Sequence, residues 1–250
     1  MKTLEGQKIV VTGGSRGLGL GIVEALVAEK AQVTVVARDT ERLAEVAKRL
    51  SVAVISGDIT DPALARAVLG DIRPSVLVLN AGATPPMAPL HELSWENFSR
   101  NWEVDVKGNF LWLQAALQLP LPRGSRVLVG SSGAAVNGSP LSGSYAGAKR
   151  TLWFMAGYAN DAAKGLDLDI RFQAIVPQQI IGETALGRQA SEVYARRRGM
   201  SVEAFLASFG APLPPRQVGA HVVSILTDAR YESGVAFGLK GDRGIIPLDA

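Results

Sequence analysis

The sequence predicts an α/β fold in which a doubly wound, mostly parallel sheet carries helices on both faces. Short runs rich in β-branched residues alternate with longer helix-like segments along most of the chain. These runs are almost continuously apolar, which is typical of strands buried on both faces of a parallel sheet. The regular strand–helix–strand alternation also implies right-handed crossovers between parallel strands.

Six runs are predicted strands, and they recur at intervals along the chain. They are residues 8–12, 32–37, 52–56, 76–79, 126–129 and 169–176. After the first strand, residues 17–30 predict a helix that places Leu18, Ile22 and Leu26 along one stripe. Residues 40–50 predict a second helix, which opens with a capping threonine and carries charges on its outer face.

No low-complexity linker or shift in composition interrupts the sequence, so residues 1–250 are predicted to form one domain. The least regular stretch, residues 182–215, contains three prolines and two helix-like pieces at 189–198 and 201–209. Ligands of open α/β sheets bind beyond the carboxyl ends of the strands. Because this stretch follows the last of the six strands, we expect it to cover a substrate; an ordinary surface excursion is the alternative.

Composition and charge exclude several classes of protein. The formal net charge is only +3 and no dense basic stripe is present, so nucleic acid is not an expected partner. The triple arginine at 196–198 is expected to be a solvated helical face. The chain has no cysteine, which excludes disulfides and thiolate zinc sites. His91 and His221 are not spaced as metal ligands, so no metal site is expected.

The expected location is the cytoplasm, without association with a membrane. No apolar run approaches the roughly 18 residues that are needed to span a bilayer. Residues 1–6 lead into the first strand without the layout of a signal peptide.

A glycine-rich turn follows the first strand. Residues 12–19 read Thr-Gly-Gly-Ser-Arg-Gly-Leu-Gly and open the first predicted helix. Glycines allow a tight turn and let the backbone approach a phosphate, while the helix N-terminus supplies N–H groups and a partial positive charge. The order strand, turn, helix is the context that a dinucleotide site requires.

A tyrosine and a lysine form the candidate catalytic pair. Tyr145 and Lys149 are four residues apart in a helix-like stretch, so their side chains project from one face. A nearby ammonium stabilises phenolate, which a tyrosine needs in order to exchange protons near neutral pH. Ser132 follows the strand at 126–129, where its hydroxyl is placed to hydrogen-bond a substrate carbonyl.

The glycine turn, Asn80-Ala81-Gly82, Ser132 and the Tyr-x-x-x-Lys pair together resemble the single-domain short-chain dehydrogenases/reductases over nearly the whole chain. The resemblance implies a Rossmann-type fold and a nicotinamide cofactor that carries the hydride chemistry. The residues expected to bind the cofactor are Gly13, Ser15, Arg16, Gly17, Leu18, Gly19, Arg38, Asp58, Ile59, Asn80, Ala81, Gly82, Tyr145, Lys149, Pro177 and Ile180.

The same resemblance implies the catalytic roles. Lys149 is expected to hold the nicotinamide ribose and to favour ionisation of Tyr145, while Ser132 positions and polarises the substrate carbonyl. Tyr145 then donates a proton in reduction or removes one in oxidation. Three alternatives remain: a catalytically silent NADP(H)-binding sensor, a 3-oxoacyl thioester reductase, and an isomerase or dehydratase that uses a transient oxidation.

Charge at the end of the second strand favours NADP(H) over NAD(H). An acid there would accept from a free ribose 2′-OH, but the chain has Ala37 followed by Arg38. Arg16, inside the glycine turn, adds a second cation, and two guanidiniums suit a 2′-phosphate. Asp39 is placed to neutralise Arg38 in part.

Several positions depart from the family pattern. Asp105 stands where the family usually has an asparagine whose main-chain carbonyl fixes a water near the lysine. An ionised carboxylate accepts hydrogen bonds without donating and favours a charged Lys149, so we hypothesise an altered but working proton relay through Asp105. Gln178 replaces a glycine, and it either contacts substrate or fills space. Gly182 replaces the usual hydroxyl residue, and the next threonine is Thr184.

The residues expected near the substrate are mostly small or apolar, which suits a neutral, fairly apolar ketone or secondary alcohol. They are residues 83–90 and 134–138 with Leu186, Tyr194, Met200 and Phe205. The sequence does not predict the physiological substrate, the favoured direction or the stereochemistry.

Two predicted helices, residues 101–119 and 144–164, carry more apolar surface than a solvent-facing helix needs. The resemblance to the short-chain dehydrogenases/reductases, whose members are commonly homotetramers, implies a homotetramer or a homodimer. The residues predicted at the seam between subunits are Trp112, Leu113, Trp153, Phe154 and Met155.

Overall fold

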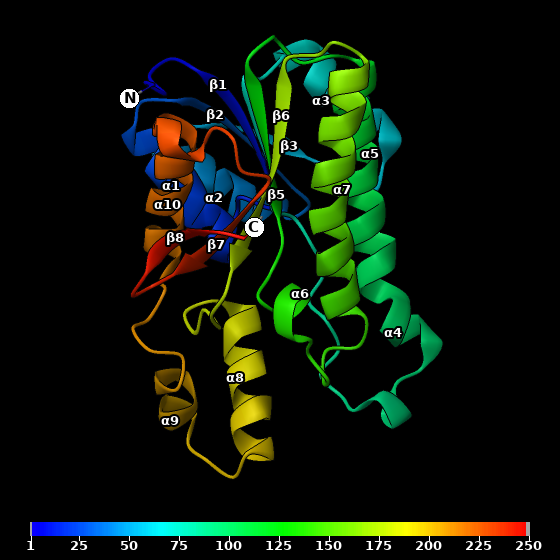
Figure 1. The fold of residues 1–250 in the computed structure, drawn as a ribbon, viewed down its shortest axis with the longest axis vertical. Coiled ribbons are helices and arrows are strands. Elements are labelled where there is room, and N and C mark those ends of the chain that lie inside the picture. Colours follow the sequence, from blue (N-terminus) through cyan, green and yellow to red (C-terminus); the bar gives the residue numbers. More distant parts are fainter. Residues whose placement is uncertain (1, 249–250) are drawn as a thin grey trace.

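The computed structural model describes residues 2–248 and has the predicted doubly wound architecture (Figure 1). One eight-stranded sheet runs through these residues in the order β3-β2-β1-β4-β5-β6-β7-β8, and within it β8 alone is antiparallel to its neighbour. The strands are β1 (Lys8–Thr12), β2 (Gln32–Ala37), β3 (Ala53–Ser56), β4 (Val76–Leu79), β5 (Ser125–Gly130), β6 (Ile170–Pro177), β7 (Ala236–Lys240) and β8 (Gly244–Pro247). All six predicted strands are present.

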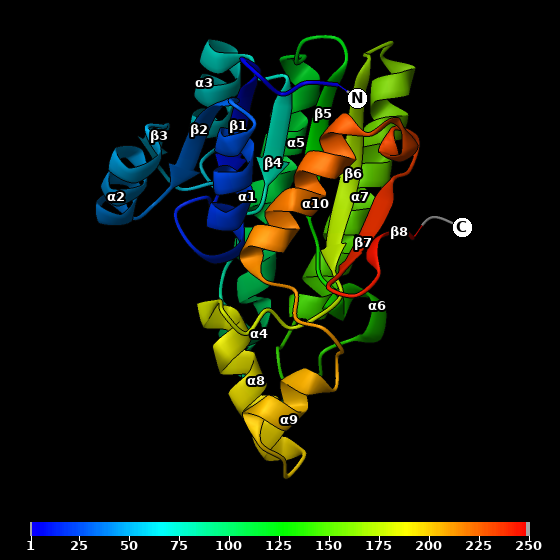
Figure 2. The same cartoon turned by 90° about the vertical axis from the view of Figure 1, so that its left-hand side faces the viewer.

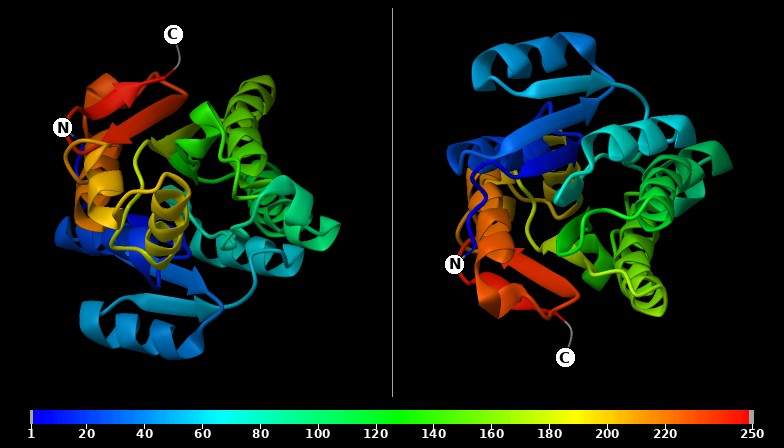
Figure 3. Two further views of the ribbon diagram at one scale, coloured as in Figure 1. Left: turned by 90° about the horizontal axis from the view of Figure 1, so that it is seen from below. Right: turned by 90° about the horizontal axis from the view of Figure 1, so that it is seen from above.

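Helices cover both faces of the sheet (Figure 3). One face carries α1 (Gly17–Ala28), α2 (Thr40–Leu50) and α10 (Pro215–Thr227). The other face carries α3 (Pro62–Ile72), α5 (Lys107–Gln118) and α7 (Tyr145–Gly165). The sheet is therefore the middle layer of three.

The buried core has two halves because successive side chains of a strand point to opposite faces. In β4, Leu77 and Leu79 pack into the core beneath α5 and α7, whereas Val76 and Val78 pack into the core beneath α1 and α10. This double burial explains why the strands are almost continuously apolar in sequence.

The predicted cover at 182–215 folds as two helices beyond the carboxyl end of β6 (Figures 1 and 2). These are α8 (Ala185–Arg197) and α9 (Val202–Ala207). Each begins at a hydroxyl cap: Thr184 accepts a hydrogen bond from the Gly187 N–H at 2.9 Å, and Ser201 accepts one from the Ala204 N–H at 3.1 Å.

The structure adds elements that the sequence analysis did not predict: α3, β7, β8, the short α4 (Trp95–Asn101) and α6 (Ala134–Asn137), and the 3₁₀ turns η1 (Leu90–Glu92) and η3 (Ala229–Tyr231). The predicted helix at 101–119 is interrupted by a π-helical turn, η2 (Trp102–Val106). None of the helices within residues 2–248 is both long and apolar enough to cross a membrane.

Candidate active site

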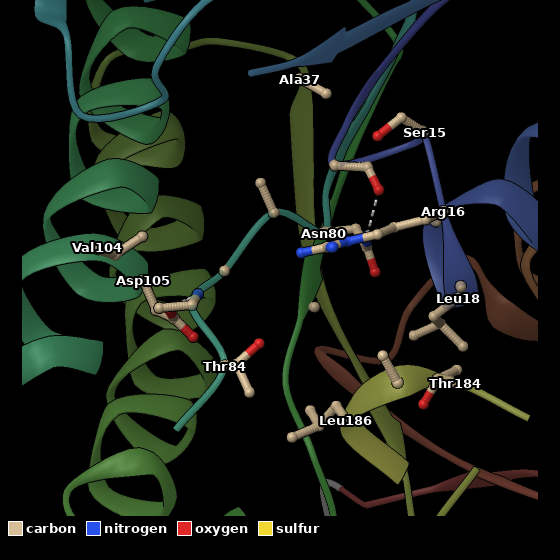
Figure 4. A pocket seen from close by; sticks show the side chains of 18 of the residues that line it. Ser15, Arg16, Leu18, Ala37, Asn80, Thr84, Val104, Asp105, Thr184 and Leu186 are labelled. Carbon is tan, nitrogen blue, oxygen red and sulfur yellow. Dashed lines mark hydrogen bonds between the residues drawn. The ribbon is translucent and has the colours of Figure 1, made fainter. Parts of the chain in front are cut away.

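A cleft of about 660 Å³ opens at the carboxyl ends of the strands, between the glycine turn, α7 and the start of α8 (Figure 4). The structure brings most of the expected cofactor and catalytic residues together here. Those that line the cleft are Gly13, Ser15, Arg16, Gly17, Leu18, Gly19, Arg38, Asp58, Ile59, Asn80, Ala81, Gly82, Asp105, Tyr145, Lys149 and Pro177. Ser132, Gln178 and Ile180 lie outside this set.

The glycine turn is packed so closely that its glycines cannot be replaced without movement. Gly13 has a φ of +69°, and a Cβ there would lie 2.7 Å from the Cα of Ala81. A Cβ on Gly19 would lie 2.2 Å from the carbonyl oxygen of Gly13. The turn therefore presents bare backbone at the start of α1, which fits the diphosphate of a dinucleotide.

The end of β4 is bonded to this turn. The Thr12 hydroxyl accepts hydrogen bonds from the backbone N–H groups of Asn80 and Ala81, at 3.1 and 3.2 Å. The Asn80 side-chain amide donates to the Gly13 carbonyl at 3.3 Å. The expected Asn-Ala-Gly segment is thus fixed directly against the glycine turn.

At the far end of the cleft, the charges pair differently from the sequence-based expectation. Arg38 lies 3.8 Å from the Asp58 carboxylate rather than pairing with Asp39. Asp39 caps α2 by accepting from the Arg42 N–H and forms an ion pair with the Arg42 guanidinium at 3.0 Å. Hydrogen bonds from Thr60, together with Arg38, keep the pKa of Asp58 below its ordinary value.

Lys149 and Asp105 form a buried ion pair at the catalytic end. The Lys149 Nζ lies 3.1 Å from Asp105 Oδ2, and both side chains are almost fully buried. Nζ also donates to the Gly130 carbonyl at 3.2 Å. Burial alone lowers the pKa of Lys149, but the charges of Asp105 and Tyr145 outweigh it and raise this pKa above its ordinary value.

The π turn η2 shapes the surroundings of Asp105. Asp105 Oδ1 accepts a hydrogen bond from the Ala83 N–H at 2.7 Å, and the main-chain carbonyl of Asp105 accepts one from the Asn109 side chain at 2.7 Å. The Asn101 amide donates to the Ala83 carbonyl at 3.0 Å. A Cβ on Gly82 would lie 2.7 Å from Asp105 Oδ2. Asp105 therefore joins the loop after β4 to Lys149.

Tyr145 begins α7, with its backbone N–H bonded to the Ser142 carbonyl at 3.1 Å. The Lys149 Nζ lies 5.6 Å from the centre of the Tyr145 ring. Ser132 is half-buried just after β5, and its hydroxyl accepts the Ala134 N–H at 3.3 Å.

After β6, the structure places the residues at and next to the departure from the family pattern, Gln178 and Gln179. The Gln178 amide lies against β7, where a Cβ on Gly238 would be 3.0 Å from its Cδ. This placement favours space filling among the two roles that the sequence left open. Gln179, by contrast, bonds the carbonyls of Phe209 and Ala211 at 3.0 and 2.7 Å, which ties the end of the cover to the sheet.

Of the four side chains in the cover that were expected near the substrate, Leu186 lines the cleft. The other three lie outside the residues that line the cleft. Phe205 is buried between α8 and α9 and stacks on Tyr194, whose hydroxyl lies 2.7 Å from the Ser139 hydroxyl. Met200 is exposed at the tip.

The cleft residues that the sequence analysis did not name include two arginines, Arg42 and Arg188. Arg42 is the third residue of α2, and its place in the first turn of the predicted helix at 40–50, close to Arg38, could have revealed it. Arg188 lies one turn into α8, and the predicted helix at 189–198 began too late to include it.

Comparisons with known proteins agree with this geometry. A family model described as short chain dehydrogenase matches residues 7–193. The chain belongs to the short-chain dehydrogenase/reductase family, and it is an oxidoreductase of alcohol or carbonyl groups with a Rossmann fold and a nicotinamide cofactor.

Several curated relatives align with most of the chain. An L-fucose dehydrogenase of Oryctolagus cuniculus is 30% identical over 94% of this chain and 84% of its own length. A 2,5-dichloro-2,5-cyclohexadiene-1,4-diol dehydrogenase of Sphingobium indicum is 32% identical over 71% of this chain and 74% of its own length. Among solved structures, L-sorbose reductase from Gluconobacter frateurii, complexed with NADPH and L-sorbose, has a TM-score of 0.78 at 22% identity, covering 96% of this chain and 97% of that one. That likeness shows the shared fold.

Proposed function

We propose that this protein is an NADPH-dependent carbonyl reductase or alcohol dehydrogenase in which Tyr145 is the acid and base. The observation that carries the proposal is the cleft itself. It joins a glycine cradle for a diphosphate to a tyrosine and a buried lysine on one helix.

The chain's own residues would position the substrate and move the proton. Tyr145 donates its phenolic proton to the carbonyl oxygen in reduction and recovers one in oxidation. Lys149 keeps its charge because Asp105 lies beside it, and this charge favours the phenolate. Ser132 hydrogen-bonds the substrate oxygen. When bound, the nicotinamide supplies or accepts the hydride.

Asp105 completes the proposed catalytic group. Its carboxylate forms an ion pair with Lys149 and accepts a hydrogen bond from the Ala83 N–H, and its main-chain carbonyl accepts one from the Asn109 side chain. A carbonyl oxygen has two lone pairs, so that of Asp105 retains capacity for a relay water. This arrangement supports the hypothesis of an altered relay that still works.

The preference for NADP(H) rests on the charges near the ribose end of the cleft. Arg16 and Arg38 are joined there by Arg42, so three guanidiniums line this part of the site. Asp39 is occupied by the cap and ion pair with Arg42, and the acid beside Arg38 is Asp58, at 3.8 Å. A 2′-phosphate binds such a set by charge-assisted hydrogen bonds.

For the substrate we propose a neutral, fairly apolar ketone or secondary alcohol. Leu186 and Val104 line the cleft, and Glu183 and Arg188 are the charged residues of the cover that line it within residues 2–248. The names of the relatives favour a second candidate class. Fucose is a sugar, so sugars belong in the same panel, whereas the dichlorinated cyclohexadiene diol is a less polar secondary alcohol of the first class.

We further propose a homotetramer or homodimer in the cytoplasm. The predicted seam needs correction, because Trp112 and Leu113 are buried in the core beneath the sheet. Phe154 remains exposed on α7, and Tyr158 and Phe110 lie exposed on α7 and α5. These aromatic side chains supply the apolar surface that a second subunit would cover.

The proposal is tested by following the absorbance of reduced nicotinamide in both directions. NADPH and NADH are offered side by side with apolar ketones, L-sorbose and an acyl-carrier-type 3-oxoacyl thioester, and NADP⁺ and NAD⁺ are offered with L-fucose and an apolar secondary alcohol. Consumption of NADPH with a ketone is expected. Preferential consumption of NADH would contradict the role given to the arginines. Tight NADPH binding without turnover on any substrate would favour the silent sensor.

A further inference from the structure

The ion pairs of the cleft leave two cations without a carboxylate. Five cationic side chains line it: Arg16, Arg38, Arg42, Lys149 and Arg188. Three are paired with Asp58, Asp39 and Asp105. Within residues 2–248, no carboxylate lies within ion-pair distance of Arg16 or Arg188. An anion that enters the cleft therefore meets two guanidiniums whose charge is not yet compensated.

Arg188 is held at the cleft rather than extended into solvent. Its Nη1 donates to the carbonyl of Glu183 at 2.9 Å, so the guanidinium folds back to the start of α8. Glu183 itself lines the cleft. A guanidinium has five N–H donors, so four remain for a ligand.

The start of α8 lies against the start of α1. A Cβ placed on Gly17 would be 3.5 Å from Thr184 Cγ2, and Figure 4 shows Thr184 next to Leu18. Arg188 lies one helical turn after Thr184 and so projects from the same face of α8. An anion bound at the backbone of the glycine turn is therefore within the neighbourhood of Arg188.

We propose that Arg188 binds the diphosphate of the nicotinamide dinucleotide from the cover, opposite the glycine turn. The inference rests on the proposed cofactor site and deepens it. Arg16 and Arg38 serve the ribose phosphate, whereas Arg188 serves the diphosphate that NADPH and NADH share. Because α8 also carries Leu186 towards the substrate, cofactor binding fixes the cover before a substrate enters.

The test compares Arg188→Ala with Arg197→Ala, a matched change at an exposed arginine in the last turn of the same helix. Binding of NADPH, NADH and adenosine 2′-phosphate is measured by isothermal titration calorimetry. Arg188→Ala is expected to weaken NADPH and NADH by about the same factor, roughly tenfold, since one charge-assisted contact is lost. Adenosine 2′-phosphate, which has no diphosphate, should bind as it does to the wild type.

A second readout separates this contact from a general loss of structure. In the wild type, NADPH should slow amide hydrogen exchange across residues 185–207, and Arg188→Ala should lose this protection while Arg197→Ala keeps it. Unchanged NADPH and NADH binding in Arg188→Ala would overturn the proposal, as would weakening of NADPH alone, which places Arg188 at the ribose phosphate. Equal binding of NADH and NADPH by the wild type would contradict only the proposed cofactor preference, and the Arg188 comparison would still decide.

Discussion

Asp105 and Lys149 show how a single departure from the family pattern alters the catalytic end of the site. Where the pattern has a neutral amide, this chain buries a carboxylate 3.1 Å from the lysine ammonium. The pairing with Asp105 raises the pKa of Lys149 in the folded protein. The ion pair therefore contributes fully to the free energy of unfolding from neutral pH to about 10.5, the ordinary lysine value. It is lost as the pH rises through the higher pKa of the folded state.

Asp105→Asn is predicted to move the rate–pH profile. Without the carboxylate, Lys149 loses its proton at a lower pH, so the alkaline loss of activity should shift towards neutral pH. The free energy of unfolding at pH 7 should fall by about 3 kcal/mol, because the ammonium stays buried without its counter-charge. The measurements are kcat/KM against pH and urea unfolding. Asp39→Asn makes the same chemical change at a residue where asparagine still caps the helix, and its alkaline limb should not move; a stationary limb in Asp105→Asn would refute the relay hypothesis.

Sequence reasoning reached some residues of the site and not others for a physical reason. The glycine turn before α1 and the pair of Tyr145 and Lys149 on α7 each have a fixed spacing within one segment of the chain. The structure brings the two segments together at the cleft. Arg188 comes from the cover, whose first helix begins at Ala185, earlier than its periodicity indicated. The pairing of Asp39 with Arg42 instead of Arg38 depends on the geometry of a helix cap, which charge patterns do not specify.

At the scale of elements, a buried arginine joins the carboxyl end of α10 to the middle of the sheet. The Arg126 guanidinium, in β5, donates to the carbonyls of Ile225 and Tyr231 and to the side chain of Gln173. Burial and the nearby charge of Arg171 lower the pKa of Arg126 to about 10, so it stays charged at neutral pH. These bonds satisfy helix-end and loop carbonyls that the sheet would otherwise bury.

Arg126→Met is predicted to lower the free energy of unfolding by about 2–4 kcal/mol, because it removes the buried donor to the Ile225 carbonyl and the Gln173 side-chain oxygen. The Tyr231 carbonyl keeps the Gln173 amide as a donor, at 2.8 Å. Urea unfolding measures the loss. Arg123→Met is the matched control, since Arg123 makes one exposed hydrogen bond to the Asp167 carbonyl and should cost under about 0.5 kcal/mol. If the two variants lost the same free energy of unfolding, the buried hydrogen bonds of Arg126 would stabilise the fold no more than the exposed one of Arg123.

The elements that the sequence predicted are those whose burial is evident from a local run of apolar residues. Strands such as β4 and β5 stand out because both of their faces are covered, whereas the edge strand β3 is only partly buried. The antiparallel β7–β8 hairpin was missed because Gly238 and Gly244 interrupt its short strands. The helix α3 was missed although Asp61 caps it and Pro62 opens it, a start signal that apolar periodicity alone does not contain. The π turn at 102–106, which contains the buried Asp105, has no local signature in the sequence.

At the scale of the whole molecule, the exposed aromatic face of α5 and α7 is the feature that concerns assembly. Phe154 and Tyr158 stack with their rings 6.3 Å apart, and Arg150 lies 4.6 Å from the Phe154 ring. Nearly half of Phe154 and Phe110 is exposed. We expect this face to lie between subunits.

Phe154→Glu is therefore predicted to convert the oligomer to smaller species in light scattering coupled to size exclusion, because two charges would be buried across a symmetric contact. Met200→Glu, at the exposed tip of the cover, should leave the mass unchanged. A wild-type protein that is monomeric at micromolar concentration would contradict the expected oligomer.

The most direct test of the whole account is turnover of NADPH with a ketone by the wild type and by Tyr145→Phe. Tyr158→Phe is the control, because it removes the same hydroxyl from the exposed side of the same helix. The account predicts that Tyr145→Phe lowers kcat at least 100-fold while NADPH still binds, since a positioned acid contributes about 10²–10⁴-fold, and that Tyr158→Phe matches the wild type. Full activity in Tyr145→Phe would contradict the central claim and would require another proton donor in the cleft.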